Sequence, residues 1–231
     1  MAGVLRACFD TLRMSGKGAL GVAALAVAAC TVAAVPLQVG AGREWLSPGG
    51  DSGKTHHSRL TAINAQNVGQ LGLAWAADLD TFRGQEATPV VVDGVLYTSG
   101  TAGRAYAFDA ASGKELWRFE PEVDMQVNRT VCCDMVNRGV AVARGKVFVA
   151  SLDGWMYALD ARNGAVVWKS DFIENRAKGD NSTGAPEVAG DVVVIGMGGA
   201  EYDVRGYVTA LDLDTGKLRW RWHVVPHDPK L

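Results

Sequence analysis

Three segments of the sequence repeat one another at a nearly constant interval, and this repeat constrains the fold more than any other feature. They are AYAFDAASGKELWRF (residues 105–119), MYALDARNGAVVWKS (156–170) and VTALDLDTGKLRWRW (208–222). Intervals of 51 and 52 residues separate their aspartates and also their tryptophans, which are Asp109, Asp160 and Asp212 and Trp117, Trp168 and Trp220. Each segment combines an apolar strand, a polar turn that ends in glycine, and a second strand with tryptophan. The pattern predicts three β-hairpins built on one plan.

A further strand-rich run precedes each of these hairpins. The runs are TPVVVDGVLYTSG (88–100), GVAVARGKVFVAS (139–151) and PEVAGDVVVIGMG (186–198). Their alternation and β-branched content predict strands, and no helical period of useful length accompanies them. Four strands in a repeat of about 50 residues are typical of a propeller blade. A β-sandwich would not require a fixed repeat with tryptophan at one position, so we predict an all-β propeller.

The length of the chain sets the number of blades. Residues 42–231 hold about 3.7 repeats, whereas closed propellers use about 4–8 blades. An open arc exposes a sheet edge and a blade face, which are aggregation liabilities. The sequence therefore predicts a partial propeller of three to four blades, with residues 42–231 as the N-terminal portion of a longer propeller domain.

Residues 1–41 have the pattern of a leader. Arg6, Arg13 and Lys17 precede the uncharged run GALGVAALAVAACTVAAV (residues 18–35). A basic stretch before an apolar run of this length is typical of a secretory signal peptide, and the alternative is a retained N-terminal anchor. Cys30 also loosely fits a lipoprotein box. We predict export.

Composition excludes two broad classes of protein. Hydrophobic residues make up 48% of the chain and charged residues 21%, which are globular values and exclude global disorder. Residues 42–231 contain 20 basic and 24 acidic residues, a formal charge of −4. This mild acidity argues against a nucleic-acid-binding protein, which would be basic.

Cys132 and Cys133 are the two cysteines that follow the leader. Adjacent Cα atoms lie about 3.8 Å apart, which is below the usual disulfide range of about 4.4–6.8 Å. An oxidising compartment favours a bond all the same. Two interpretations follow: a strained vicinal disulfide that could stack against a planar ligand, or two small buried side chains.

Three polar residues lie just before strand-rich runs. They are Glu86 in RGQEATP, Arg138 in VNRG and Thr183 in NSTGAP. Each could be an ordinary exposed or turn residue. The alternative for Arg138 is bidentate pairing with the carboxylate of a ligand.

The segment GMGGAEYDVRG (196–206) is the richest in candidate ligand contacts. Gly198, Gly199 and Ala200 allow a ligand to approach the backbone closely. Glu201 follows directly and could help to bind a hard cation such as calcium. The segment is not a dinucleotide-binding motif, because Glu201 occupies the place of the last glycine and no helix is predicted after it.

These motifs resemble those of the pyrroloquinoline quinone (PQQ)-dependent alcohol dehydrogenases of the methanol/ethanol type. The resemblance extends from about Trp45 to Pro226 and rests on RGQEATPVVVDGVLYTS, CCDMVNRGVAV, LDGWMYALDARNG, STGAP and GGAEYDVRGYVTALDLDTGK, in that order. It implies an eight-bladed propeller, a periplasmic oxidoreductase, PQQ, and a bound calcium or lanthanide ion. Met197 departs from the family, in which a polar or small residue is usual.

The resemblance also implies roles for individual residues. Contacts with PQQ would come from Glu86, Cys132, Cys133, Arg138, Thr183, Gly198, Gly199 and Ala200. Cys132 and Cys133 would form a vicinal disulfide against one face of PQQ, and Glu201 would be a metal ligand. The family oxidises small primary alcohols to aldehydes by hydride transfer to PQQ and passes electrons to a cytochrome c.

The family's catalytic aspartate, its asparagine metal ligand and the tryptophan on the other face of PQQ would all fall beyond residue 231. No catalytic residue is therefore expected within this chain, and the chain alone is expected to be inactive.

A second class of protein also fits the repeat. Outer-membrane assembly lipoproteins use similar repeats in a non-catalytic propeller scaffold, and Cys30 favours this alternative. Such a scaffold has no physical need for the cysteine pair, Glu86, Arg138 and Glu201, so these residues favour the enzyme.

Overall fold

The computed structural model describes residues 44–199, 202 and 204–225. The predicted leader, residues 1–41, lies outside the described residues. The chain divides into two units, and the described part of the smaller unit is residues 61–72. This segment contains one 3₁₀ turn, η1 (Val68–Gln70). The side chain of Asn67 stabilises the segment by accepting a hydrogen bond from the Asn64 amide at 2.8 Å and donating one to the Ala62 carbonyl at 2.8 Å.

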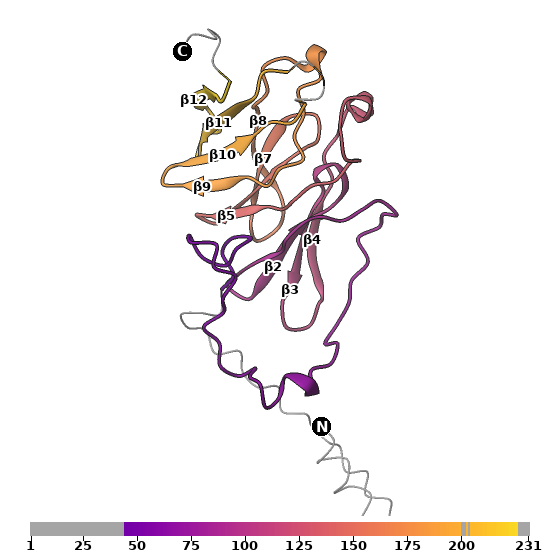
Figure 1. Ribbon diagram of the computed structural model, residues 1–231, viewed down its shortest axis with the longest axis vertical. Helices are drawn as coiled ribbons and strands as arrows, with labels where there is room; N and C mark the ends of the chain where they lie inside the picture. The colour runs from indigo at the N-terminus through magenta and orange to yellow at the C-terminus, as the bar shows by residue number, and fades with distance from the viewer. Residues whose placement is uncertain (1–43, 200–201, 203, 226–231) are drawn as a thin grey trace, which may run out of the picture. The chain divides into compact units, whose positions relative to one another are not determined.

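The larger unit contains three four-stranded antiparallel sheets (Figure 1). The first sheet consists of β1 (Val90–Val92), β2 (Val95–Ser99), β3 (Ala105–Asp109) and β4 (Glu115–Phe119). The second consists of β5 (Ala141–Ala143), β6 (Lys146–Ala150), β7 (Trp155–Asp160) and β8 (Val166–Asp171). The third consists of β9 (Glu187–Ala189), β10 (Val192–Gly196), β11 (Tyr207–Asp212) and β12 (Leu218–His223). Strand order follows chain order in every sheet, so the predicted partial propeller is confirmed.

Short 3₁₀ turns lie in the loops between the strands. They are η2 (Thr101–Gly103), η3 (Met125–Arg129) and η4 (Arg176–Lys178). In the part of the chain that the structure describes, no helix has the length and hydropathy needed to cross a bilayer.

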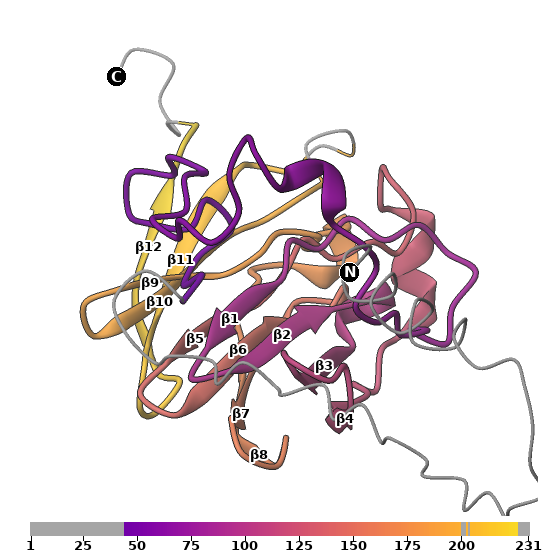
Figure 2. The ribbon, with the colours of Figure 1, turned by 90° about the horizontal axis from the view of Figure 1, so that it is seen from below.

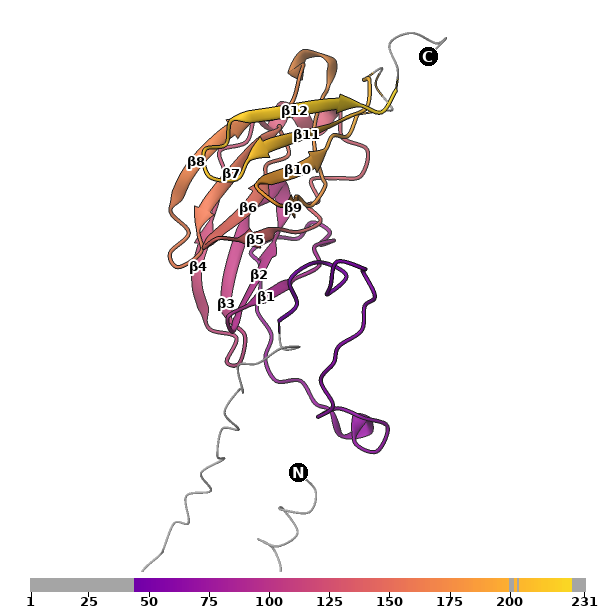
Figure 3. The same cartoon turned by 90° about the vertical axis from the view of Figure 1, so that its left-hand side faces the viewer.

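The first strands of the three sheets lie together. Neighbouring sheets contact each other through β1 and β5 and through β5 and β9, and Figure 3 shows these strands next to one another. The sheets therefore converge at their first strands, as blades do around a propeller axis.

The core lies between the faces of successive sheets (Figure 2). Alternate residues of β6 point to opposite faces, because the side-chain period of a strand is two. Val147 and Val149 pack with the first sheet, whereas Phe148 and Ala150 pack with the third. The central strands β6 and β7 of the second sheet are consequently buried on both faces.

In the first two sheets, the repeated tryptophan donates a hydrogen bond to the next sheet along the chain. The indole Nε1 of Trp117 donates to the Ala161 carbonyl at 2.9 Å, and that of Trp168 donates to the Leu213 carbonyl at 3.3 Å. Trp75, upstream of the first sheet, donates to the Ala110 carbonyl at 3.1 Å in the same way. Each acceptor directly follows a repeated aspartate.

The repeated aspartates close the hairpin turns. Asp109 accepts hydrogen bonds from the amide and hydroxyl of Ser112, and these bonds lower its pKa. Asp160 binds Arg162, and Asp212 binds Thr215, and these bonds lower the pKa of each carboxyl to about 2. Each turn ends in a glycine with φ of 71–72°.

Candidate functional site

The opposite ends of the sheets carry a second set of loops. The loops come before the first strand of each sheet and between its second and third strands. Glu86 lies four residues before β1, Arg138 three residues before β5, and Thr183 four residues before β9. Because the first strands converge, these three loops meet at one end of the unit.

Arg138 joins the three loops. Its Nη2 lies 2.8 Å from Oε2 of Glu86, and its Nη1 donates to the hydroxyl of Thr183 and, at 3.3 Å, to the Thr183 carbonyl. The side chains of Arg138 and Glu86 are 43% and 42% exposed, so the pair faces solvent. The structure thus brings together Glu86, Arg138 and Thr183, three of the residues expected to contact PQQ.

The backbone supports the same junction. The Arg138 amide donates to the Thr183 carbonyl at 3.1 Å, and the Thr88 amide donates to the Arg138 carbonyl at 3.3 Å. Gly139 has φ of 140°, and a Cβ atom there would lie 3.3 Å from the Thr88 carbonyl oxygen. Glycine is favoured at this position because residues with a Cβ atom rarely adopt this φ.

Asn137 is a residue that the sequence analysis missed. It is buried, accepts from Ser99 Oγ at 2.6 Å and the Gly139 amide at 3.1 Å, and donates to the Ala150 carbonyl at 2.9 Å. These bonds fix the backbone on either side of Arg138. Two of its three partners, Ser99 and Ala150, come from other strands, so the local sequence around Asn137 does not reveal them.

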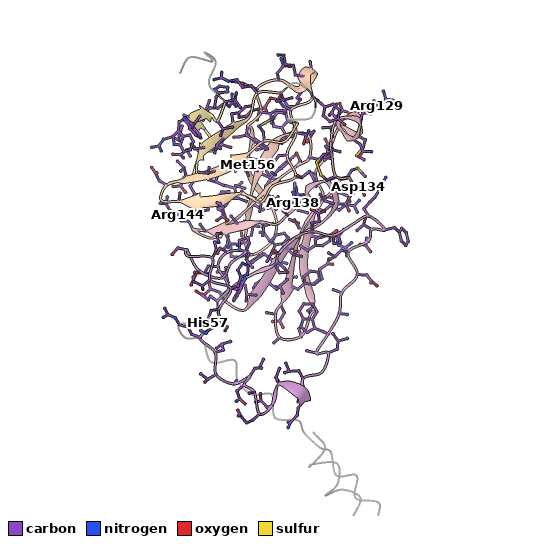
Figure 4. The ribbon with its side chains drawn as sticks, viewed as in Figure 1. His57, Arg129, Asp134, Arg138, Arg144 and Met156 are labelled. Carbon is purple, nitrogen blue, oxygen red and sulfur yellow. A yellow bond between two sulfur atoms is a disulfide. The ribbon has the colours of Figure 1, made fainter. Side chains whose placement is uncertain are left out.

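Cys132 and Cys133 are joined by a disulfide, with their Cα atoms 3.8 Å apart. Both residues are exposed, so the interpretation as two small buried side chains is wrong. Arg83 pairs with Asp134 at 2.8 Å, and the Ala102 amide donates to the Met135 carbonyl at 2.7 Å, which fixes the loop just after the disulfide. Figure 4 shows the disulfide near Asp134, on the same loop as Arg138.

Gly198 and Gly199 lie in the loop between β10 and β11. The Gly198 amide donates to the Asn181 carbonyl at 2.8 Å. Gly199 has φ of 106°, and a Cβ atom there would lie 3.0 Å from the Gly179 carbonyl oxygen. The backbone is therefore close-packed against the β8–β9 loop here, and the expected approach of a ligand to Gly198 and Gly199 stays a prediction.

Ala200 and Glu201 lie outside the described residues. Among residues 44–199, 202 and 204–225, no group of three or more His, Cys, Asp and Glu side chains is arranged to hold a metal ion. The predicted role of Glu201 as a metal ligand stays a prediction.

Residues 45–231 match the family described as "PQQ: Glucose/ethanol/alcohol dehydrogenase, beta-propeller domain". The chain belongs to the PQQ-dependent alcohol dehydrogenases. This family accounts for the repeat, for the three sheets and for the order of the motifs.

Individual relatives agree with the family. Quinohemoprotein alcohol dehydrogenase ADH IIB of Pseudomonas putida is 55% identical over 191 residues, which are 83% of this chain and 28% of the relative. The 1-butanol dehydrogenase (cytochrome c) of Thauera butanivorans is 48% identical, with coverage of 83% and 28%. A europium-containing methanol dehydrogenase structure superposes with a TM-score of 0.74 at 38% identity, with coverage of 78% and 32%. The chain thus spans under a third of the length of these PQQ-dependent relatives.

Proposed function

We propose that this chain is the N-terminal part of a periplasmic PQQ-dependent alcohol dehydrogenase and forms one side of its cofactor site. The observation that carries the proposal is the junction of Arg138 with Glu86 and Thr183, on the loop that also holds the exposed disulfide. A non-catalytic scaffold would not need an exposed guanidinium and an exposed disulfide on one loop.

The described residues fit PQQ, which is planar and carries three carboxylates. Arg138 offers a solvent-facing guanidinium, whose geometry suits a carboxylate, and Thr183 offers a hydroxyl beside it. Glu86 keeps the guanidinium oriented through their ion pair. Cys132–Cys133 would contact the planar face, and Gly198 and Gly199 would allow the backbone to approach. Ala200 is the last of the residues proposed to contact PQQ.

Bound PQQ would supply a quinone that accepts the hydride of a primary alcohol, which yields an aldehyde. The residues of this chain would bind and orient the cofactor, and the base that accepts the alcohol proton would lie in another part of the protein. A cytochrome c is the proposed electron acceptor.

The metal is a separate part of the proposal. The described residues do not form a metal site by themselves. Glu201 is proposed as one ligand of calcium or a lanthanide, both of which prefer oxygen ligands.

A chimera tests the proposed function. Residues 45–225 of this chain would replace the matching segment of the P. putida relative, which supplies the rest of the site. The chimera is expected to oxidise ethanol with PQQ and calcium in a dye-linked assay, whereas the 231-residue chain alone is not. Failure of a folded chimera to turn over, or clear turnover by the chain alone, would contradict the proposal.

Two arginine variants make the test specific to the site. Arg138→Ala should weaken PQQ binding by the chimera about 10–100-fold, since charge-assisted hydrogen bonds contribute about 1.5–3 kcal/mol. Arg144→Ala is the matched control, because Arg144 lies in the β5–β6 turn and pairs with Asp214 at 3.0 Å (Figure 4). Equal effects of the two variants would count against Arg138 as a cofactor contact.

A further inference from the structure

A buried asparagine connects three loops beside the proposed cofactor site. Asn181 is 3% exposed. Its amide nitrogen donates to the Thr130 carbonyl at 3.1 Å and to the Gly179 carbonyl at 2.9 Å. The main-chain carbonyl of Asn181 accepts a hydrogen bond from the Gly198 amide at 2.8 Å, and the two residues form an isolated β-bridge. One residue therefore contacts the β4–β5 loop, the β8–β9 loop and the β10–β11 loop.

At three glycines, the loops are packed too closely to leave room for a larger side chain. A Cβ atom on Gly179 would lie 3.1 Å from Thr130 Cβ, and one on Gly199 would lie 3.0 Å from the Gly179 carbonyl oxygen. A Cβ atom on Gly198 would lie 2.7 Å from Oδ1 of Asn181. The glycines allow the backbones to approach, and the amide of Asn181 sets the distance between them.

The residue before Asn181 fixes this junction to the third sheet. Asp180 is 3% exposed and accepts a hydrogen bond from the Tyr207 hydroxyl at 2.6 Å. It also accepts from the amides of Glu174 and Asn175, at 3.1 and 2.9 Å. Burial, together with the bond to Asp180, raises the pKa of Tyr207, so the phenol stays protonated and remains a donor.

The ends of the junction are the two elements expected to contact the cofactor. Thr130 lies two residues before Cys132, and Gly198 is itself in the predicted set. We propose that Asn181 is a positioning residue that sets the separation between the disulfide loop and the Gly198–Gly199 backbone. The inference rests on the proposed function for its meaning, because these two elements would contact the same bound cofactor.

Two substitutions change the junction from opposite sides. Asn181→Asp keeps the shape of the side chain but removes its N–H donors and places a carboxylate against two carbonyls. Gly198→Ala keeps the asparagine at position 181 but displaces its side-chain amide, since the new methyl group would meet Oδ1. Asn163→Asp is the matched control, because Asn163 lies in an exposed turn at the other end of the second sheet.

The experiment compares these variants in the full 231-residue chain. The first measurement is the rate at which a phosphine reduces Cys132–Cys133, taken at equal distance below each variant's melting temperature. The second is the Kd for PQQ from tryptophan fluorescence. Asn181→Asp and Gly198→Ala are each expected to speed reduction at least about tenfold and to raise the Kd at least about tenfold, the effect of losing one or two hydrogen bonds. Asn163→Asp should leave both unchanged.

The outcomes separate the positioning role from ordinary stabilisation and from the proposed function. A lower melting temperature with unchanged reduction rate and Kd would show a purely structural role and overturn the inference. If Asn181→Asp does not fold, the reduction rate of Gly198→Ala decides. If the unmodified chain binds no PQQ, the cofactor-binding part of the proposal fails for this chain, and the reduction rates still decide whether Asn181 sets the disulfide loop.

Discussion

The two ends of the sheets differ in how they are built. At the turn end, the same aspartate and glycine recur in each blade, and Gly113, Gly164 and Gly216 share φ values of 71–72°. At the loop end, the disulfide and the Arg138 junction each occur once among the described residues. The comparison indicates that the repeated residues stabilise the blades, whereas the residues that depart from the repeat form the proposed site.

The largest expected effect tests the contact between blades. Trp117→Ala should lower the free energy of unfolding by about 3–5 kcal/mol, because it empties a buried indole site and removes the bond to the Ala161 carbonyl. Trp220→Ala is the control at the same repeat position, where the indole is 45% exposed, and should cost under about 1 kcal/mol. Urea unfolding followed by circular dichroism measures both. Equal losses would show that the repeat position itself, rather than the neighbouring blade, determines stability.

The next prediction separates backbone strain from packing at the turn end. Gly145→Ala should cost about 1 kcal/mol, because Gly145 has φ of 69° with open space around it. Gly164→Ala should cost roughly 1 kcal/mol more, because its new methyl group would lie 2.8 Å from Trp117 in the preceding blade. The same unfolding assay distinguishes them. Identical costs would mean that the tryptophan moves aside freely.

The disulfide at the loop end should contribute little to stability. A bond between adjacent residues closes almost no loop, so it restrains the unfolded chain very little. Replacing Cys132 and Cys133 by serine should change the free energy of unfolding by less than about 1 kcal/mol. The same replacement should reduce ethanol oxidation by the chimera. A large loss of stability would instead assign the disulfide to the scaffold.

The smallest expected effect depends on pH. Arg162 lowers the pKa of Asp160 to about 2, so the charged carboxylate stabilises the folded state above the ordinary aspartate pKa of about 3.9. That contribution is lost as the pH falls through about 2. Asp160→Asn should therefore be less stable than the unmodified chain at pH 7 and about equally stable at a pH well below 2. An equal deficit at both values would point to a lost hydrogen bond instead of a lost charge.

The sequence predicted the blades better than it predicted the site. The spacing of Asp109, Asp160 and Asp212 predicted the hairpins, since turn chemistry is local and repeats. The family motifs selected Glu86, Arg138 and Thr183, and the structure joins them.

Asn137 and Asn181 were missed for a physical reason. Each has a main-chain partner in a separate strand or loop, Ala150 for Asn137 and Thr130 for Asn181, and only the packing of the blades brings these partners near. No spacing within VNRG or NSTGAP reveals those partners.

The tryptophan contacts have a consequence for how such a chain can change over time. In each case the indole donates to a main-chain carbonyl, of Ala110, Ala161 or Leu213, and not to a side chain. Every residue type carries that oxygen, so the acceptor survives almost any substitution at its position. The turns AASG, ARNG and LDTG can therefore diverge in sequence while the indole–carbonyl hydrogen bond is kept. This one bond therefore requires no coordinated change of side chain in the neighbouring blade.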